Sequence, residues 1–169
     1  RPSSRRPHIL LVTTDALSFA HTGLGGYARP VTPRLDAWAR RATTFTRAYS
    51  TSSSTANAIP ALHTGKLAPA VPALLPPQNQ ERPGGRSAPT LADHARTKGY
   101  RSLMFPGAAM FGPDAWPGVA SPFDTASIAP LARAAKGPSG KLYAAPELTR
   151  AALDALASAG DQPLLLWLH

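Results

Sequence analysis

HILLVTTDALSFAHTGLGGY, the stretch from His8 to Tyr27, gives the clearest guide to how the chain folds. Its apolar run, Ile9–Val12, leads directly into Thr13, Thr14 and Asp15. A short buried strand here would carry one carboxylate to its C-terminal end, which is where open α/β sheets bind their ligands. Aspartate is also a favoured cap residue, so Asp15 could instead cap the turn or helix that follows.

The residues that follow Asp15 favour a ligand-binding role. Ten of them form a pattern through their order and spacing: Leu17, His21, Gly23, Gly26, Tyr27, Arg29, Thr32, Pro33, Leu35 and Asp36. This series resembles the opening of the sulfatase family, within the alkaline phosphatase superfamily, where a strand ends in a metal-binding Asp. The resemblance implies an alkaline-phosphatase-like α/β fold, with a mainly parallel sheet and helices on both faces. It also implies that Asp15 is a metal ligand.

The length of the chain suits one domain, because 169 residues with 43% hydrophobic side chains can bury a core. Complete members of the resembled family are much longer, however. We therefore expect residues 8–169 to be the N-terminal part of a sulfatase-like catalytic domain, with the remainder of that domain as partner. Residues 1–7, RPSSRRP, are expected to be a basic tail or linker.

The net charge of +9 and a pI near 10.9 would suit an anionic partner. The basic residues are mostly Arg, are spread along the chain, and form no nucleic-acid-binding motif. We expect an anionic ester substrate and no specific nucleic acid. The chain has no cysteine, which excludes disulfides and cysteine-bound zinc within it.

No apolar run of the sequence approaches the roughly 20 residues of a membrane span. Residues 1–7 have no apolar core, so they do not form a signal peptide. The resemblance suggests an extracytoplasmic or membrane-anchored protein, with any membrane attachment made through segments outside this chain.

Alternating strand and helix patterns predict parallel βαβ units with right-handed crossovers. The predicted strands are residues 8–14, 44–49, 100–105 and 163–168. The first two predicted helices are residues 33–42, with Trp38 in the core, and 56–63, interrupted by Pro60. A third covers residues 89–95, is capped by Ser87 or Thr90 and is ended by Gly99, and a fourth covers residues 146–159. Residues 67–87 and 107–140 are predicted to be loops, with a short helix near 128–134 in the second.

A candidate nucleophile lies after the second predicted strand. In the resembled family the nucleophile stands nine residues before a Thr-Gly pair, which here leads from Thr64 back to Thr55. A Thr at this place resembles the phosphoethanolamine and phosphoglycerol transferases of the superfamily. A metal ion on its oxygen would activate the hydroxyl for attack. Ser54, its neighbour, stays open as the alternative nucleophile.

The expected cofactor is a divalent metal ion, calcium or zinc, held by Asp15 and Thr55. One carboxylate and one hydroxyl are too few for a complete site, so the remaining ligands are expected beyond His169 and this chain alone is expected to be inactive. The chain also departs from the family pattern. Asn57 and Ile59 replace a Pro and an Arg, and residues 105–107 lack the Lys and His that grip sulfate. A non-catalytic sulfatase-like domain with a binding or scaffolding role is therefore the alternative function.

The remaining histidines have less definite predicted roles. His21 is expected to be structural, His63 to be partly buried beside its helix, and His94 to lie on a helix surface. His169 coincides with the start of a family segment that follows a strand and approaches the active site.

Overall fold

The computed structural model describes residues 6–67, 88–107, 117–120, 123–124, 135–137, 140–142 and 145–169. The chain divides into two compact units. One, called here the sheet unit, consists of Arg1–Thr13 and Thr51–His169, and the other is the 14–50 unit, Thr14–Ser50. Each unit is described by itself.

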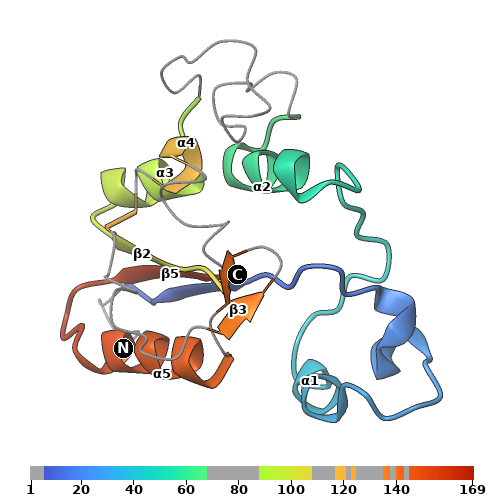
Figure 1. Cartoon of the computed structure of the whole chain (residues 1–169). Coiled ribbons are helices and arrows are strands. Elements are labelled where there is room, and N and C mark those ends of the chain that lie inside the picture. Colours follow the sequence, from blue (N-terminus) through green and yellow to red (C-terminus); the bar gives the residue numbers. More distant parts are fainter. Residues whose placement is uncertain are drawn as a thin grey trace. The chain divides into compact units, whose positions relative to one another are not determined.

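A parallel three-stranded sheet forms the centre of the sheet unit (Figure 1). Its strands are β1 (Ile9–Val12), β2 (Arg101–Phe105) and β5 (Leu164–Leu168), in the order β1-β5-β2. Ile9 lies opposite Leu165, and Arg101 lies opposite Leu164. Three of the four predicted strands and the mainly parallel sheet are thus confirmed.

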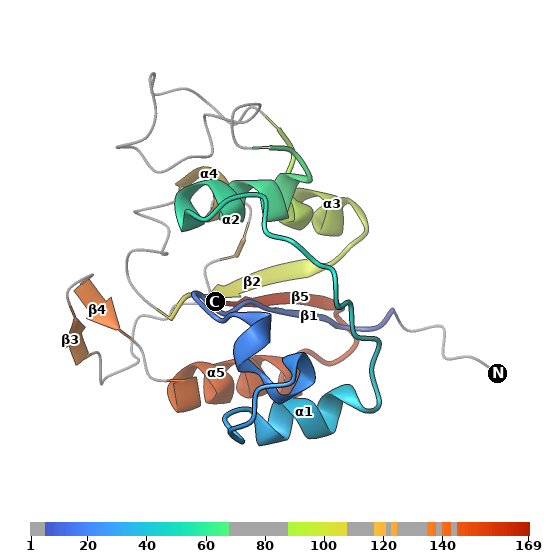
Figure 2. The ribbon, with the colours of Figure 1, turned by 90° about the vertical axis from the view of Figure 1, so that its right-hand side faces the viewer.

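Alternate side chains of β5 pack on opposite faces of this sheet. Leu165 and Trp167 join a core with α2 (Thr55–Thr64) and α3 (Leu91–Thr97). Leu164 and Leu166 join a second core with α5 (Ala145–Ala157). Figure 2 shows the sheet between α5 on one side and α2 and α3 on the other. Helices therefore cover both faces, as predicted.

The helices of the sheet unit begin and end at recognisable signals. Thr90 caps α3 in a reciprocal capping box with Asp93, and Gly99 follows the helix at φ +76°. The short helix α4 (Pro117–Ala120) adds Val119 to the core that it shares with α2 and α3. The predicted break at Pro60 is wrong, because α2 continues through it. Proline removes one backbone donor, and the burial of Ile59, Pro60 and Ala61 offsets that loss.

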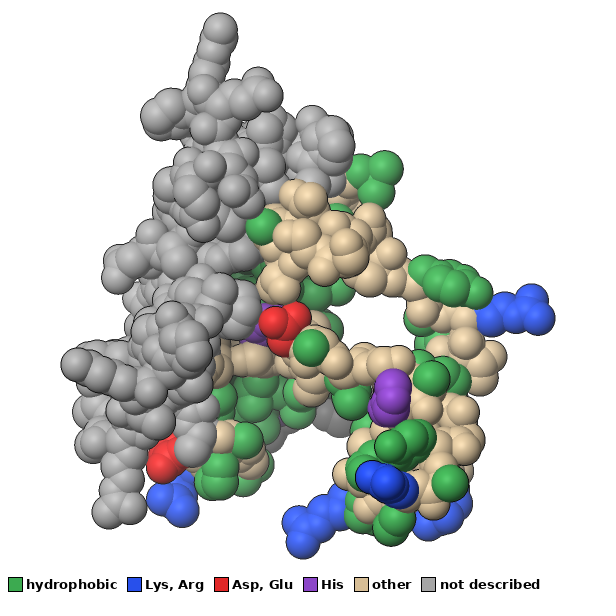
Figure 3. Space-filling model, turned by 45° about the vertical axis from the view of Figure 1, so that its right-hand side comes forward, with side chains coloured by type: hydrophobic (Ala, Val, Ile, Leu, Met, Phe, Trp, Pro, Cys, Tyr) green, Lys and Arg blue, Asp and Glu red, His purple; other side chains and the backbone are tan. Residues whose placement is uncertain are grey.

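The predicted strand at 44–49 is wrong. Residues 43–50 form no strand and turn at Thr46 and Arg47. The β-branched and aromatic residues of this stretch fit a strand only when a neighbouring strand and a core are there to pack against. Phe45 and Tyr49 are instead 77% and 85% exposed, and Trp38, predicted to be core, is 61% exposed. Figure 3 shows hydrophobic side chains, in green, at the surface of the described residues.

A second, two-stranded antiparallel sheet joins β3 (Ala135–Gly137) to β4 (Gly140–Leu142). The sequence predicts a loop here, so this pair is a correction. The predicted helix at 128–134 and nearly all of the predicted loop at 67–87 lie outside the described residues.

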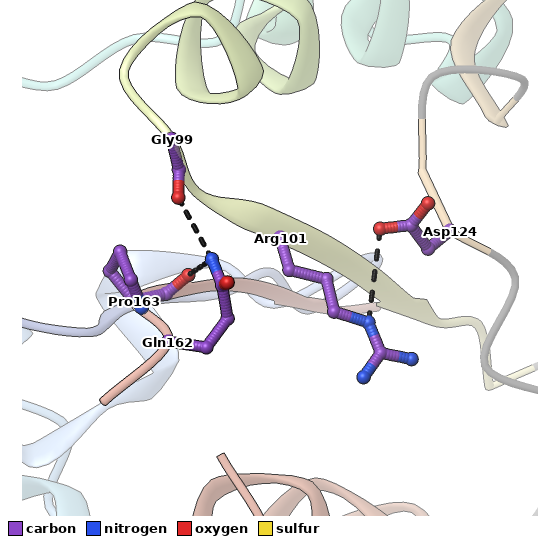
Figure 4. Close-up of polar contacts among 5 residues, drawn as sticks. All are labelled: Gly99, Arg101, Asp124, Gln162 and Pro163. Atoms are coloured by element: carbon purple, nitrogen blue, oxygen red, sulfur yellow. Dashed lines mark hydrogen bonds and ion pairs between the residues drawn. The ribbon is translucent and has the colours of Figure 1, made fainter. Parts of the chain in front are cut away.

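Polar side chains link the segments that lie around the N-terminal ends of β2 and β5 (Figure 4). The amide of Gln162 donates to Gly99 O at 2.8 Å and to Pro163 O at 3.4 Å. Arg101 lies 3.8 Å from Asp124, but both side chains are 56% exposed, so this ion pair contributes little to stability. The backbone bond from Asp124 N to Ser102 O holds that segment to β2.

The 14–50 unit contains two 3₁₀ turns, η1 (Phe19–His21) and η2 (Gly23–Gly25), and the helix α1 (Pro33–Ala39). Asp36 of α1 organises them. Its carboxylate accepts from Leu24 N at 3.2 Å and from the Thr32 hydroxyl at 3.0 Å, and that hydroxyl accepts from Gly23 N. A Cβ on Gly23 would lie 2.2 Å from an Asp36 oxygen, so only glycine fits there.

No helix among the described residues has the length and apolar character needed to cross a membrane.

Replacing Gly23 with Ala should destabilise the 14–50 unit by about 2 kcal/mol, because the added methyl group displaces the Asp36 carboxylate. Hydrogen exchange should become faster in residues 14–50, with β5 unchanged. Ser18→Ala is the control, since the exposed Ser18 side chain makes no capping bond. Equal exchange rates in the Gly23→Ala and wild-type chains would contradict this role of Asp36.

Candidate functional site

The C-terminal edge of the parallel sheet brings together three segments that are far apart in the sequence. Thr13 N donates to Leu168 O at 2.9 Å just after β1 ends, and His169 N donates to Phe105 O at 3.1 Å at the end of β2. Gly107 N donates in turn to His169 O. A Cβ on Gly107 would lie 2.8 Å from that oxygen, so the close approach requires glycine. The backbone thereby fixes His169 at the edge where open α/β sheets bind ligands.

A hydroxyl links the side chains at this edge. The indole Nε1–H of Trp167 donates to Thr13 Oγ1 at 3.0 Å, and His169 Nδ1 lies 2.7 Å from the same oxygen. A hydroxyl can donate one proton and accept two. Thr13 can therefore donate to Nδ1 of a neutral His169. It can also accept from a protonated His169 and turn its own proton to Leu168 O, at 3.4 Å.

His63 lies beneath this edge, on α2. It is 2% exposed, and its ring lies 4.2 Å from the Trp167 ring and 5.7 Å from the Phe123 ring, edge-on to both. Neither of its ring nitrogens has a hydrogen-bond partner among the described residues. An unsatisfied buried polar atom costs about 1–3 kcal/mol, so the burial of these nitrogens lowers the stability of the fold. The expectation of partial burial is therefore corrected to full burial.

Burial, and to a smaller extent the nearby His169, together lower the pKa of His63 from 6.5 to about 4. The imidazole of His63 is accordingly neutral at physiological pH. The nearby His169 is half-buried and hydrogen-bonded to Thr13.

Thr55, the predicted nucleophile, is the first residue of α2 and is half-buried. The preceding Ser54 is extended and exposed, and its carbonyl accepts from Asn57 N at 3.0 Å and from Ala58 N at 2.9 Å. At the other end, Gly65 takes φ +67° and donates its N–H to Ala61 O. The spacing from Thr55 to the Thr64–Gly65 pair is therefore the length of one helix with a glycine stop.

Asp15, the predicted metal ligand, lies in a turn after β1 and is exposed. Ala16 beside it takes φ +56°, a left-handed conformation that is uncommon for a non-glycine residue. Asp15 belongs to the 14–50 unit and Thr55 to the sheet unit, so their convergence on one metal ion stays a prediction.

Carboxylate and hydroxyl oxygens are suitable donors for a divalent cation, so Asp15 and Thr55 fit part of a metal site. Within the described part of the chain, no three His, Cys, Asp or Glu side chains are grouped to hold an ion. The side chains described here therefore supply only part of the ligand set.

The other histidines have structural surroundings. His21 lies 5.1 Å from the Tyr27 ring within the 14–50 unit, which favours its expected structural role. His94 is exposed on α3, as predicted. The full burial of His63 could not be predicted from the sequence, because Trp167, whose ring it contacts, is remote in the sequence. The only local signal was a histidine at a position where the resembled family usually has Leu.

Comparison with known proteins relates the chain as a whole to a family. A sequence model of the sulfatase family matches residues 7–169. A solved structure, the soluble domain of lipooligosaccharide phosphoethanolamine transferase A from Neisseria meningitidis, superposes with a TM-score of 0.69 at 20% identity. The match covers 100% of this chain and 46% of that one, so the chain corresponds to part of an alkaline-phosphatase-like domain. No curated protein matches the chain.

Acid should destabilise the fold through His63. Its pKa is lower in the folded chain than in the unfolded chain, so protons bind preferentially to the unfolded state. The free energy of unfolding should fall as the pH drops from 6.5 toward 4, by about 3 kcal/mol in all, and this contribution should be constant above 6.5.

Urea unfolding across this pH range would measure the loss. His63→Leu should remove it, whereas His94→Leu, at an exposed histidine, should retain it. Identical pH dependence in the His63→Leu and wild-type chains would show that His63 does not titrate in this way.

Proposed function

This chain belongs to the sulfatase family, and we propose that it serves metal-dependent attack on a sulfate or phosphate ester, with Thr55 as the nucleophile. The similarity of its fold to a phosphoethanolamine transferase is consistent with a group-transfer reaction as well as with hydrolysis. The substrate would be an anionic ester, which suits the net charge of +9.

The observation that carries the proposal is the position of Thr55 at the N-terminus of the ten-residue helix α2. Amide N–H groups point outward from the first turn of a helix, and the helix dipole is positive there. An anionic ester bound at this end would receive hydrogen bonds to its non-bridging oxygens. The half-buried hydroxyl of Thr55 would then lie beside the phosphorus or sulfur atom.

In the proposed reaction, Thr55 Oγ1 gives its proton to solvent and forms a bond to the phosphorus or sulfur atom, while the bond to the ester oxygen breaks. The departing alkoxide takes up a proton from solvent. Water, or the hydroxyl of an acceptor, would then attack the same phosphorus or sulfur atom, lose its proton, and release Thr55 as the hydroxyl. A bound calcium or zinc ion would favour the Thr55 alkoxide by lowering the pKa of the hydroxyl. Asp15 and Thr55 would hold that ion, together with ligands beyond His169.

His169 would contribute to substrate binding at the C-terminal edge of the sheet. Thr13 can be its hydrogen-bond partner whether its imidazole is neutral or protonated. His63, buried beneath this edge, stays neutral and would contribute no charge to the site.

A non-catalytic domain is the second candidate, and one observation favours it. Ile59, at the position where the family has an Arg, is 6% exposed and packs in the core with Met104 and Leu165. This position therefore offers no cation to a substrate. Binding of an anionic ester without turnover would be the activity of such a domain.

The test compares this chain with a longer form that continues past His169. We expect the chain alone to bind zinc or calcium weakly and to be inactive, because Asp15 and Thr55 leave zinc at least two ligands short of its usual four. The longer form should bind a divalent ion and turn over aryl phosphodiesters or aryl sulfates. Metal analysis and a chromogenic assay would measure both properties.

Thr55→Ala should lower turnover by the longer form by about a thousandfold or more, since the atom that attacks is lost. Thr55→Ser should keep part of the activity, and Ser54→Ala should keep most of it. Asp15→Asn should weaken metal binding. Full activity of Thr55→Ala would exclude Thr55 as nucleophile, and loss of activity only in Ser54→Ala would assign the reaction to Ser54. A metal-free, inactive longer form would favour the non-catalytic domain.

A further inference from the structure

The contacts of His63 are unusual for a residue that merely fills space. Its ring lies edge-on to Trp167, at 4.2 Å and 63°, and edge-on to Phe123, at 5.7 Å and 85°. Edge-to-face contacts of this kind fix the orientation of both rings, because the positive edge of one ring meets the negative face of the other. An aliphatic side chain would fill the same volume without this directional preference.

The orientation of Trp167 has consequences at the C-terminal edge of the sheet. The buried indole donates its one N–H to Thr13 Oγ1, and Thr13 Oγ1 is the hydrogen-bond partner of His169 Nδ1. The Trp167 ring also lies 5.7 Å from the ring of His169. A continuous chain of contacts therefore runs from His63 through Trp167 and Thr13 to His169.

The polarity of His63 argues against a purely structural role. Among the described residues, its two buried nitrogens gain no hydrogen bond, so Leu at this position would avoid their desolvation cost. What Leu cannot supply is the ring edge against Trp167. Compared with Leu, His63 therefore lowers the stability of the fold but provides an oriented ring contact with Trp167.

We propose that His63 is a positioning residue for His169: its ring holds the Trp167 indole in the orientation that keeps Thr13 hydrogen-bonded to His169. His63 itself contacts no substrate. This inference rests on the proposed function, in which His169 contributes to substrate binding at this edge of the sheet.

The test uses two readouts in the chain itself at neutral pH. The first is the exchange rate of the Trp167 indole N–H with solvent, and the second is the ¹⁵N chemical shift of His169 Nδ1, which reports its bond to Thr13. Neither readout involves turnover, so failure of the proposed chemistry would leave both unchanged.

His63→Leu should speed indole exchange by about tenfold or more and move the Nδ1 shift toward that of a solvent-exposed histidine. His63→Phe keeps a ring edge and should retain both wild-type signals. His94→Leu, at an exposed histidine of α3, controls for the loss of a histidine elsewhere. Thermal unfolding of each variant would show whether changes in the indole exchange rate and the Nδ1 shift track the loss of stability or the loss of the aromatic ring.

Two results would overturn the proposal. Wild-type indole exchange and Nδ1 shift in His63→Leu would show that the ring is not needed. Loss of both signals in a folded His63→Phe chain would show that the ring edge alone does not hold Trp167. If His63→Leu does not fold, His63→Phe still decides the question, because retention of both signals supports the ring and their loss refutes it.

Discussion

The burial of β5 between β1 and β2 is the constraint on which the sheet unit depends. Leu164, Leu165, Leu166 and Trp167 are each 2% exposed or less, because a central parallel strand is covered on both faces. Each of these side chains removes apolar surface from water, which is the largest favourable term in folding. The same strand supplies residues to both hydrophobic cores. Without β5, neither β1 nor β2 would have a partner in this sheet.

That central strand also positions the residues at its C-terminal end. Backbone bonds from Thr13 to Leu168 and from His169 to Phe105 align the ends of all three strands. Thr13 and His169 converge there, above a core that is apolar apart from the ring of His63. Trp167 lies at the boundary, with its ring in the core and its N–H bonded to Thr13. The packing of Trp167 in the core therefore helps to fix the positions of Thr13 and His169.

The glycine-rich pattern that follows Asp15 has a different physical origin. In the 14–50 unit, Gly23 makes room for the Asp36 carboxylate, and Gly25 makes room for the carbonyl of Phe19. Thr22 joins the two 3₁₀ turns, since its hydroxyl donates to Phe19 O and accepts from Gly25 N. Much of the sequence pattern typical of the family therefore builds a local scaffold. Asp15 and its strained neighbour Ala16 stand at the start of this scaffold.

Local features could be predicted from the sequence because they depend on neighbouring residues. Apolar runs predicted β1, β2 and β5, the Thr90 cap predicted the start of α3, and helical periodicity predicted α5. The fold class followed from the strand and helix alternation, and the family followed from the residues after Asp15. The roles of Asp15 and Thr55 remain predictions, since both rest on the family pattern and the two residues belong to different units.

By itself, the sequence determined the periodic strands and helices, their caps and the glycine positions, because these follow from interactions within a few residues. Only the tertiary structure decided what depends on distant partners. Residues 44–49 have strand propensity but found no neighbouring strand, and α2 continues through Pro60 because its apolar side chains are buried. His63 became a buried neutral base because the fold packs it against Trp167, a contact that no local pattern encodes.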